Sequence, residues 1–301
     1  EFFTTKLNPH YDKFITWQFL KLKEKGYVIK GKHPVVWDPK ANTAVGDHDR
    51  VEGEGETPQE FTLLKYKFND EFIIAATLRP ETVYGQTNLW IGAELDYVKA
   101  KVNDEIWIIS QDAADKLVDQ EKHIHILEKI KGKDLIGKEA VAPMIERKIP
   151  ILPSYFCDPK KGTGIVTSVP SDAPDDWMGL YDLQNNQKEC EKYGLDFEKI
   201  KSIKPIPIIE SSDLGDMAAV KICTDLKIQN QKQRDLLEKA KKIVYKKGFY
   251  EGIMGKKCGE FAGLKVEIAK DKVKEKLIKQ NEAEKYYELT GKVVSRGLTE
   301  C

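Results

Sequence analysis

The segment that most constrains the fold starts at Phe61, where the sequence takes on a period of two residues. Two sets of side chains alternate along it: Thr62, Leu64, Tyr66 and Phe68 interleave with Leu63, Lys65 and Lys67. Alternate residues of a β-strand face the same side, so this pattern predicts a strand. Phe72–Ala76 is a short apolar run typical of a strand buried on both faces, and Asn69-Asp70 between them suits a hairpin turn. The core is therefore expected to be built on paired strands.

More short strands are expected after this hairpin, at Leu89–Ile91, Tyr97–Val102, Ile106–Ile109, Ile124–Leu127, Ala140–Met144 and Ile165–Thr167. Ser110 is expected to cap a short helix that runs through Val118. Many short strands separated by turn signals favour a barrel or a sandwich over a doubly wound sheet. We therefore predict an α+β fold, in which a β-barrel core of short strands is decorated by helices and carries a helical or irregular insertion.

Three amphipathic helices are expected beside the strands. The first covers residues 9–25, with Asn8 as its N-cap and Gly26 as its C-terminal stop. The second is Gln231–Lys247, ended by Gly248, and the third is roughly Asp271–Gln280.

The chain is expected to be organised around one main domain, residues 59–291. Residues 1–58 would form a helix and an irregular connector before it, and residues 292–301 a strand that leaves it. Residues 183–250 are rich in lysine and glutamate, and we interpret them as an insertion packed on the strand core.

Composition limits the classes of function. Lysine plus arginine and aspartate plus glutamate each number 49, so the formal net charge is zero. A free-standing nucleic-acid binder is usually basic, so any nucleic-acid contact is expected to be local. No stretch approaches the ~20 apolar residues that span a bilayer, and no signal peptide is recognised, so no membrane association is expected. The five cysteines are scattered, as free thiols of a cytoplasmic protein would be. His123 and His125 are the one close histidine pair, and without neighbouring ligands they predict no metal site.

The first candidate site is Thr77–Thr87, which follows a predicted buried strand. Thr77 closes that strand, and Arg79 offers a planar donor fork suited to phosphate or ribose oxygens. Glu81 can pair with Arg79 or cap a backbone amine. Thr82 adds a hydroxyl and a methyl group that could measure the size of a ligand side chain. The alternative is an ordinary junction between a strand and a turn.

The second candidate is Gly162–Asp176. Ser171 or Asp172 could cap a helix that opens near Pro174. Asp175 and Asp176 would then lie in the first helical turn, where the helix dipole stabilises negative charge. Such a carboxylate stays ionised and suits an ammonium group better than general acid catalysis, which needs a raised pKa. The alternative is simple N-terminal capping. We expect the two stretches to meet and form one hydrolytic pocket.

The chain lacks the G-x-S-x-G, G-x-x-x-x-G-K-[ST], H-E-x-x-H and dinucleotide-binding motifs. No serine or cysteine lies near a histidine in the sequence. If the chain is an enzyme, catalysis is expected to come from positioned and polarised water rather than from a protein nucleophile.

Thr77–Thr87 together with Gly162–Asp176 resembles the paired signature of an editing domain of class I aminoacyl-tRNA synthetases, which is inserted into the catalytic fold as connective peptide 1. The Thr-x-Arg-Pro-Glu-Thr run is shared by leucyl and valyl enzymes. Thr167–Asp176 is similar to the leucyl enzymes of eukaryotes and archaea, because the valyl version usually has Pro-Ala-His-Asp-Pro here. The chain lacks both signatures of the synthetic site, so the resemblance implies an excised piece that returns toward the catalytic fold at residues 292–301.

The resemblance also implies roles for single residues. Asp176 would bind the α-ammonium of the misattached amino acid, while Thr77 and Arg79 would hold the terminal ribose and the attacking water; these three form the expected catalytic set. Thr82 would crowd out correct leucine. The expected substrate-binding residues are Thr82, Leu78, Tyr84, Thr167, Ser168, Val169 and Asp172, with Thr167–Val169 forming the wall beside the terminal adenine.

The implied function is post-transfer editing: hydrolysis of isoleucine, norvaline or methionine from mischarged tRNA(Leu), while Leu-tRNA(Leu) is spared. The expected partners are the 3′ end of tRNA(Leu) with its terminal adenosine and the misactivated amino acids, and the piece is expected to be a cytoplasmic monomer. No cofactor is expected here, since ATP and Mg²⁺ would serve only the full-length ligase. Two alternatives stay open: a valyl-type domain that clears threonine, and a non-catalytic tRNA-docking module that uses the Lys-rich helix Gln231–Lys247.

Overall fold

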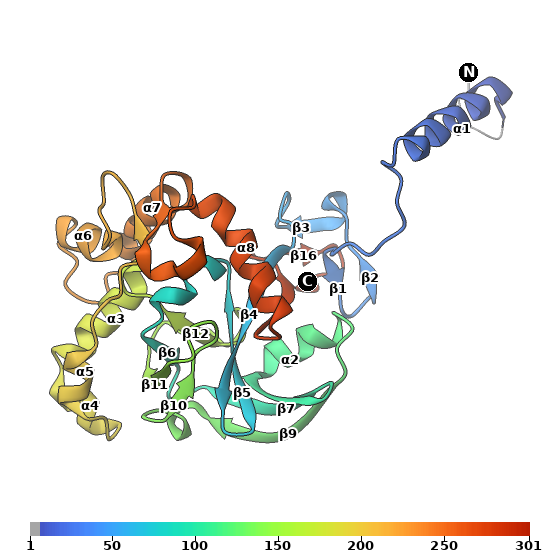
Figure 1. Ribbon diagram of the computed structural model, residues 1–301. Helices are drawn as coiled ribbons and strands as arrows, with labels where there is room; N and C mark the ends of the chain where they lie inside the picture. Colours follow the sequence, from blue (N-terminus) through green and yellow to red (C-terminus); the bar gives the residue numbers. More distant parts are fainter. Residues whose placement is uncertain (1–6) are drawn as a thin grey trace. The chain divides into compact units, whose positions relative to one another are not determined.

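The computed structural model describes residues 7–301, and the chain divides into two compact units (Figure 1). The larger, Gln59–Glu288, is called the sheet unit below. The other joins the segment up to Pro58 with Leu289–Cys301 and is called the terminal unit.

The sheet unit is built on one ten-stranded sheet with the order β12-β6-β11-β10-β4-β5-β8-β7-β9, to which β15 adds by pairing with β4. Its strands are β4 (Gln59–Phe68), β5 (Glu71–Thr77), β6 (Asn88–Ile91), β7 (Asp96–Val102), β8 (Glu105–Ser110), β9 (Ile124–Lys131), β10 (Glu139–Val141), β11 (Lys148–Pro153), β12 (Ile165–Ser168) and β15 (Ala283–Glu288). The pairs β6–β11 and β5–β8 are parallel, and the other pairs of this sheet are antiparallel.

A mixed helix-and-strand fold is therefore confirmed, but the predicted closed barrel is not. Among the described strands, β12 and β9 stand at the two ends of the pairing order and do not pair with each other. The barrel was predicted from the number and shortness of the strands. Those properties do not determine whether the outermost strands meet, because that depends on contacts between segments far apart in the sequence.

The predicted hairpin is confirmed by β4 and β5, which pair from Phe68↔Glu71 to Thr62↔Thr77. Asn69 turns the chain with a φ of 55°, the left-handed conformation that asparagine tolerates in tight turns. Leu64 and Tyr66 point into one hydrophobic cluster and Leu63 into another, as the period of two predicts.

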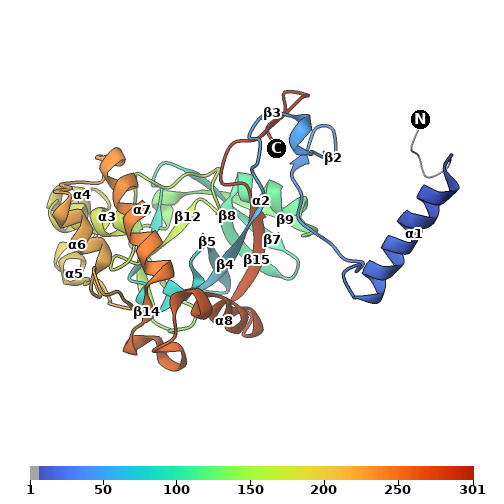
Figure 2. The same cartoon turned by 90° about the horizontal axis from the view of Figure 1, so that it is seen from above.

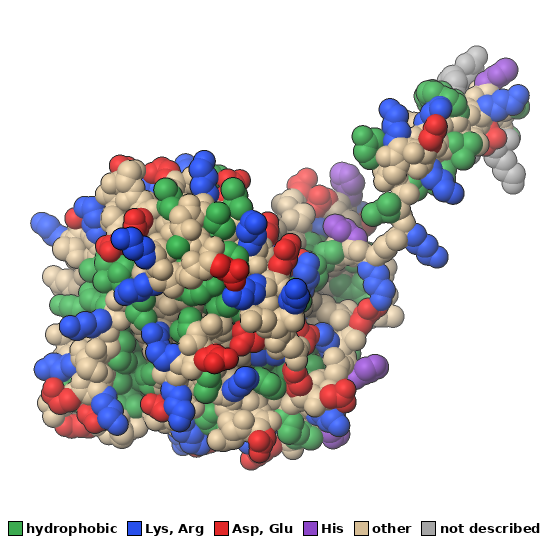
Figure 3. Space-filling view, in the orientation of Figure 1, with side chains coloured by type: hydrophobic (Ala, Val, Ile, Leu, Met, Phe, Trp, Pro, Cys, Tyr) green, Lys and Arg blue, Asp and Glu red, His purple; other side chains and the backbone are tan. Residues whose placement is uncertain are grey.

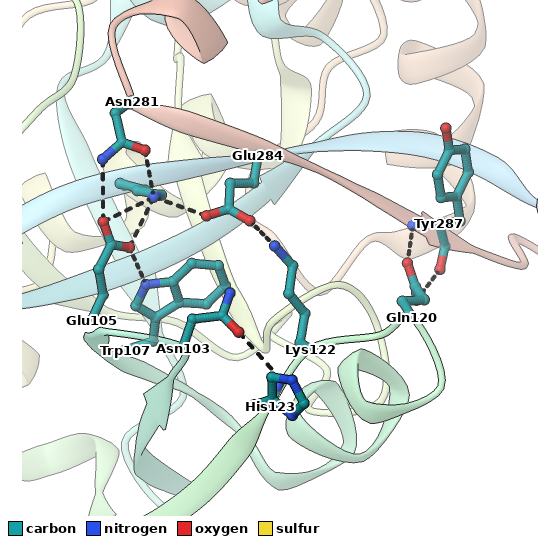
Figure 4. A network of polar contacts seen from close by, with 10 residues as sticks. Asn103, Glu105, Trp107, Gln120, Lys122, His123, Asn281, Glu284 and Tyr287 are labelled. Carbon is teal, nitrogen blue, oxygen red and sulfur yellow. Dashed lines mark hydrogen bonds and ion pairs between the residues drawn. The ribbon is translucent and has the colours of Figure 1, made fainter. Parts of the chain in front are cut away.

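Lys65 lies on the same face of β4 as Leu63 and is also buried, with only 3% of its surface exposed. Its ammonium group lies 2.8 Å from a carboxylate oxygen of Glu105 and 3.0 Å from one of Glu284 (Figure 4). Asn281 accepts a hydrogen bond from it, and the ring of Trp107 lies 5.4 Å from its nitrogen. These ion pairs connect β4 to β15, with which it also pairs through the backbone, and to β8, with which it does not pair.

Most helices of the sheet unit gather at the β12 end of the sheet, away from β9 (Figures 1 and 2). The helices of this unit are α2 (Gln111–Val118), α3 (Pro174–Gln184), α4 (Gln187–Lys192), α5 (Phe197–Ser202), α6 (Ala218–Asp225), α7 (Arg234–Tyr250) and α8 (Val266–Lys279). Met178, Cys223 and Leu237 lie in a shared cluster of α3, α6 and α7.

The predicted insertion is thus mostly helical, but three helix ends were predicted wrongly. Helix α7 starts at Arg234 rather than at the predicted Gln231. Gly248 does not end α7; it is buried inside the helix, which continues to Tyr250. Helix α8 starts at Val266, before the predicted Asp271. The prediction placed the stop at Gly248 because glycine favours helix ends, but packing of the last turn of α7 overrides that preference.

The terminal unit contains α1 (Pro9–Glu24), two short strand pairs and a small cluster of Val36, Val45 and Val293. Its strands are β1 (Trp37–Asp38), β2 (Thr43–Ala44), β3 (Arg50–Glu52) and β16 (Val294–Ser295). The side chain of Asn8 accepts hydrogen bonds from the backbone of His10 and Tyr11, as the predicted N-cap should. In the described part of the chain, no helix combines the length and the apolar character needed to cross a membrane.

Candidate functional site

The two candidate stretches lie against each other, as predicted. The first leaves β5 and forms the 3₁₀ helix η2 (Pro80–Gly85), and the second leaves β12 and enters α3. The guanidinium of Arg79 joins them, because its Nη1 donates a hydrogen bond of 3.0 Å to the carbonyl oxygen of Asp172. Its Nε lies 3.2 Å from a carboxylate oxygen of Glu81, so the predicted Arg79–Glu81 pair is also confirmed.

Both threonines of the first stretch are bonded to the backbone of Arg79. The hydroxyl oxygen of Thr77 accepts a hydrogen bond of 3.0 Å from the Arg79 amide. The hydroxyl of Thr82 donates one of 2.8 Å to the Arg79 carbonyl, and Thr82 is only 5% exposed. The short turn around Arg79 is therefore held from both sides. The Thr77 hydroxyl still has its own hydrogen to donate.

Arg79 is enclosed by protein groups, with 19% of its side chain exposed. Its Cζ lies 4.8 Å from the centre of the Tyr245 ring, and its Nη2 is buried without a hydrogen-bond partner among the described residues. Burial disfavours its charge, but the negative charges of Glu81 and Asp172 outweigh this and raise the pKa of Arg79. Arg79 is thus a fixed cation. Because Nη2 is buried, the ribose contact that the resemblance implies for Arg79 stays a prediction.

Glu81 is the buried partner of this cation. It is 1% exposed, and burial raises the pKa of its carboxyl group, against the opposing effect of Arg79. Its Oε2 has no hydrogen-bond partner in the described structure. A buried charge without its counter-charge is strongly destabilising, so Glu81 depends on Arg79.

The hydroxyl groups of the predicted adenine wall are bonded inside the protein. Thr167 lies 2.6 Å from the hydroxyl of buried Tyr66, and Ser168 lies 3.4 Å from the hydroxyl of Thr87. The Val169 amide donates a hydrogen bond of 2.7 Å to Asp176. Thr167, Ser168 and Val169 are each less than a tenth exposed, so this wall is rigid and presents little side-chain polarity.

Asp176 lies in the first turn of α3, but its charge is not favoured there. The carboxylate accepts hydrogen bonds from the Val169 amide and from the indole of Trp90, the latter at 3.1 Å. Burial raises the pKa of Asp176 to about 7, against the effect of the Val169 amide, and the charge of Asp175 raises it further. The expectation that Asp176 stays fully ionised is therefore corrected: burial outweighs the helix dipole, which typically contributes ~0.3–1 kcal/mol.

The predicted cap of α3 is also corrected. The N-cap position is Ala173, and no side chain caps the helix. Ser171 instead donates a hydrogen bond of 2.6 Å to the carboxylate of Asp172. Burial raises the pKa of Asp172 to about 6, although Arg79 and Ser171 oppose the shift. The loop thus carries two carboxyl groups that titrate near neutral pH.

Leu78 and Tyr84, the two remaining predicted substrate-binding residues, lie in different environments. Leu78 is 37% exposed and so is available at the surface of the first stretch. Tyr84 packs its ring 6.3 Å from that of Phe261, and burial raises its pKa to about 12. The side chain of Tyr84 therefore packs η2 against the segment that contains Phe261.

Sequence reasoning missed two aromatic partners of this site. Trp90 was recognised only as a strand residue, and Tyr245 only as part of a lysine-rich helix. Neither has a local signal, because both reach the site from segments more than 60 residues away from their partners.

Two further surface features lie outside this region. A hollow of about 630 Å³ is lined by residues such as Phe68, Lys99 and Glu128 and contains none of the predicted site residues. Acidic and basic side chains are interspersed on the face of the sheet unit drawn in Figure 3. Within the described residues, no three His, Cys, Asp or Glu side chains are grouped so as to hold a metal ion.

Comparison with known sequences identifies similar proteins over the whole chain. Residues 1–142 match the family model of class I tRNA synthetases (I, L, M and V). The leucine–tRNA ligase of Aeropyrum pernix is 43% identical over 299 residues, which are 98% of this chain and 31% of that protein. The cytoplasmic leucine–tRNA ligase of Pongo abelii is 40% identical over 100% of this chain and 27% of its own length. The chain thus spans about a third of these relatives.

The fold is also similar to that of solved structures, including the following two. The crystal structure of GlLeuRS-CP1 is 34% identical, with a TM-score of 0.68, and the match covers 76% of this chain and 99% of that one. The cytosolic leucyl-tRNA synthetase editing domain of P. knowlesi is 28% identical, with a TM-score of 0.70 over 77% of this chain and 97% of that one. Both are leucyl rather than valyl proteins.

Proposed function

Because this chain belongs to the leucyl-tRNA synthetase family of class I tRNA synthetases and corresponds to its CP1 editing domain, we propose that it hydrolyses the aminoacyl ester of mischarged tRNA(Leu). The proposed substrates carry isoleucine, norvaline or methionine, and Leu-tRNA(Leu) is spared. The observation that carries the proposal is the Arg79–Asp172 hydrogen bond, which supports a shared site because it links the two signature stretches.

The proposed chemistry needs no protein nucleophile. Water attacks the ester carbonyl, the bond to the terminal ribose oxygen breaks, and the products are a free amino acid and a tRNA with an intact 3′ end. Thr77 lies at the rigid end of β5, and its hydroxyl hydrogen is free to orient the water or the ribose. The fixed positive charge of Arg79 supports the developing oxyanion.

Asp176 is proposed to bind the α-ammonium group. Both of its oxygens already accept a hydrogen bond, but each carboxylate oxygen has a second lone pair for the ligand. A cation held next to the carboxylate lowers its pKa, which makes Asp176 ionised in the complex. The Trp90 and Val169 contacts fix the direction in which the carboxylate faces.

Thr82 is proposed to act as the sieve. A pocket discriminates one methylene by only ~1–3 kcal/mol, so exclusion of leucine requires a rigid obstacle. The bond from the Thr82 hydroxyl to the Arg79 carbonyl holds the side chain in one place, and the excluded volume would come from its bulk.

The test compares release of radiolabelled isoleucine and leucine from tRNA(Leu) by the 301-residue chain. Isoleucine should be released and leucine retained, and Asp176→Ala should slow the release of isoleucine at least roughly tenfold. Asp119→Ala, at an exposed aspartate at the end of α2, is the matched control and should leave it unchanged. Equal release of both amino acids, or none by the unmodified chain, would contradict the proposal.

The remaining steps of the ligase are proposed to lie outside this chain, including leucine activation with ATP and Mg²⁺. With a net charge of zero, the chain alone is expected to bind tRNA weakly and as a monomer. A cytoplasmic location is likewise proposed, by analogy with the cytoplasmic ligase of Pongo abelii.

A further inference from the structure

One face of helix α7 contacts both signature stretches. Arg234, Lys241, Tyr245 and Gly248 are separated by seven, four and three residues, which places them on one side of the helix. Arg234 and Lys241 form ion pairs of 2.7 and 3.0 Å with the two carboxylate oxygens of Asp175. The helix therefore meets the second stretch one residue before Asp176.

The same face meets the first stretch at Arg79. The Tyr245 ring lies 4.8 Å from the guanidinium carbon, and a Cβ added to Gly248 would lie 3.6 Å from Nη2. The edges of the guanidinium are fixed by Glu81 and by the carbonyl of Asp172. These bonds lie in the guanidinium plane and leave its faces free. An aromatic ring over one face is the contact that holds an arginine against rotation out of that plane.

We propose that Tyr245 is a positioning residue of the editing reaction, which holds the guanidinium of Arg79 so that the Thr77–Thr82 and Thr167–Asp176 segments keep their spacing. This inference rests on the function proposed above. Tyr245 acts through Arg79 and does not touch the substrate. The lysine-rich helix α7, which the sequence offered as a tRNA-docking surface, thereby becomes part of the frame of the site.

The test measures single-turnover and steady-state deacylation of Ile-tRNA(Leu) by the 301-residue chain. Tyr245→Leu should lower kcat roughly tenfold and change KM less than about twofold, because the substrate contacts themselves remain. Tyr245→Phe, which keeps the ring, should stay within about twofold of the unmodified protein. Tyr250→Leu is the matched control, since Tyr250 is an exposed tyrosine of the same helix whose ring contacts Phe249 rather than Arg79.

A double-mutant cycle separates positioning from general packing. Lysine at position 79 has no planar face, so Tyr245→Leu should have little further effect on kcat in an Arg79→Lys background. An equally large fall in that background would overturn the inference, and so would unchanged kcat in Tyr245→Leu. If Tyr245→Leu does not fold, Tyr245→Met keeps the bulk without the ring and is judged by the same outcomes.

A readout independent of hydrolysis is the Nε–H resonance of Arg79, assigned by its loss in Arg79→Lys. Tyr245→Leu should move this resonance, because the ring current disappears, and Tyr245→Phe should not. An unmoved resonance in Tyr245→Leu would contradict the contact itself. Absence of hydrolysis by the unmodified chain would instead contradict the proposed function, so the two failures are distinguishable.

Discussion

Arg79 and Asp172 are 93 residues apart in the sequence, and the guanidinium of one donates a 3.0 Å hydrogen bond to the backbone carbonyl of the other. Since the acceptor is a backbone atom, substitution of the Asp172 side chain leaves it in place, whereas substitution of Arg79 removes the donor. This contact is therefore controlled by a single side chain, whereas the bonds between Thr87 and Ser168, which also join the two stretches, do not depend on Arg79.

Loss of Arg79 should destabilise the protein through Glu81. In Arg79→Ala the 1%-exposed Glu81 loses its counter-charge, and breaking a buried pair on one side costs roughly 3–5 kcal/mol. The free energy of unfolding in urea measures this. Arg79→Ala combined with Glu81→Gln should recover part of the loss, and equal instability of the two variants would argue against the pair.

Loss of Asp176 should weaken substrate binding and hydrolysis. Hydrogen bonds to charged groups contribute ~1.5–3 kcal/mol, so Asp176→Ala should lower kcat/KM for Ile-tRNA(Leu) between roughly tenfold and a hundredfold. Deacylation kinetics measure it, with Asp119→Ala as the control. Activity close to that of the unmodified protein would remove Asp176 from the site.

Substitution of Thr82 should make the enzyme attack its correct product. Thr82→Ala removes the rigid obstacle, and hydrolysis of Leu-tRNA(Leu) should rise roughly 10- to 200-fold. Thr82→Ser keeps the hydroxyl that bonds the Arg79 carbonyl and loses only the methyl group, so it tests which part excludes leucine. The sieve role would be refuted by continued protection of Leu-tRNA(Leu) in Thr82→Ala.

Activity should rise with pH through about 7. The pKa of Asp176 is raised to about 7 by burial, and the ionised form binds the ammonium group, so kcat/KM should increase as this carboxyl loses its proton. The pH profile of kcat/KM for Ile-tRNA(Leu) measures it. A profile that is flat between pH 6 and 8 would show that Asp176 does not control binding in this range.

The free energy of unfolding should fall as the pH rises, whereas the activity should increase. The folded-state pKa of Asp176 is above that of an unfolded aspartate, so the folded protein holds more protons between pH ~4 and 7. The contribution of Asp176 to stability is full below pH ~4 and is lost as the pH rises through about 7. Urea unfolding at several pH values should show a smaller pH dependence for Asp176→Asn, and an unchanged dependence would contradict the shift.

Local patterns in the sequence predicted most strands of the large sheet but not which strands pair with each other. The period of two predicted β4, and the asparagine turn predicted the hairpin with β5. Strands β11 and β15 were missed, because β15 pairs with β4 across more than 200 residues and its own pattern is weak. The sequence did not show that the sheet stays open for the same reason. Closure of a sheet depends on pairing between strands that are far apart in the sequence.

The candidate site, too, was predicted only in part from the sequence. The residue types at Thr77–Thr82 and Asp172–Asp176 indicated a shared site, and the structure brings them together. Their titration was not predictable, because the pKa of Asp176 depends on burial under Trp90 and on the segments packed around it. The burial of Lys65 was hidden for the same reason: its carboxylate partners come from β8 and β15.

The register of β4 and β15 pairs Gln59 with Glu288, the first and last residues of the sheet unit. Paired residues of antiparallel strands lie about 5 Å apart, so the chain enters and leaves this unit through adjacent points. Such a domain can be gained, lost or transplanted at one surface loop of a host without breaking the host's own elements. A few residues would join its two ends into a ring, and new termini could then be opened in an exposed turn such as Asn69-Asp70.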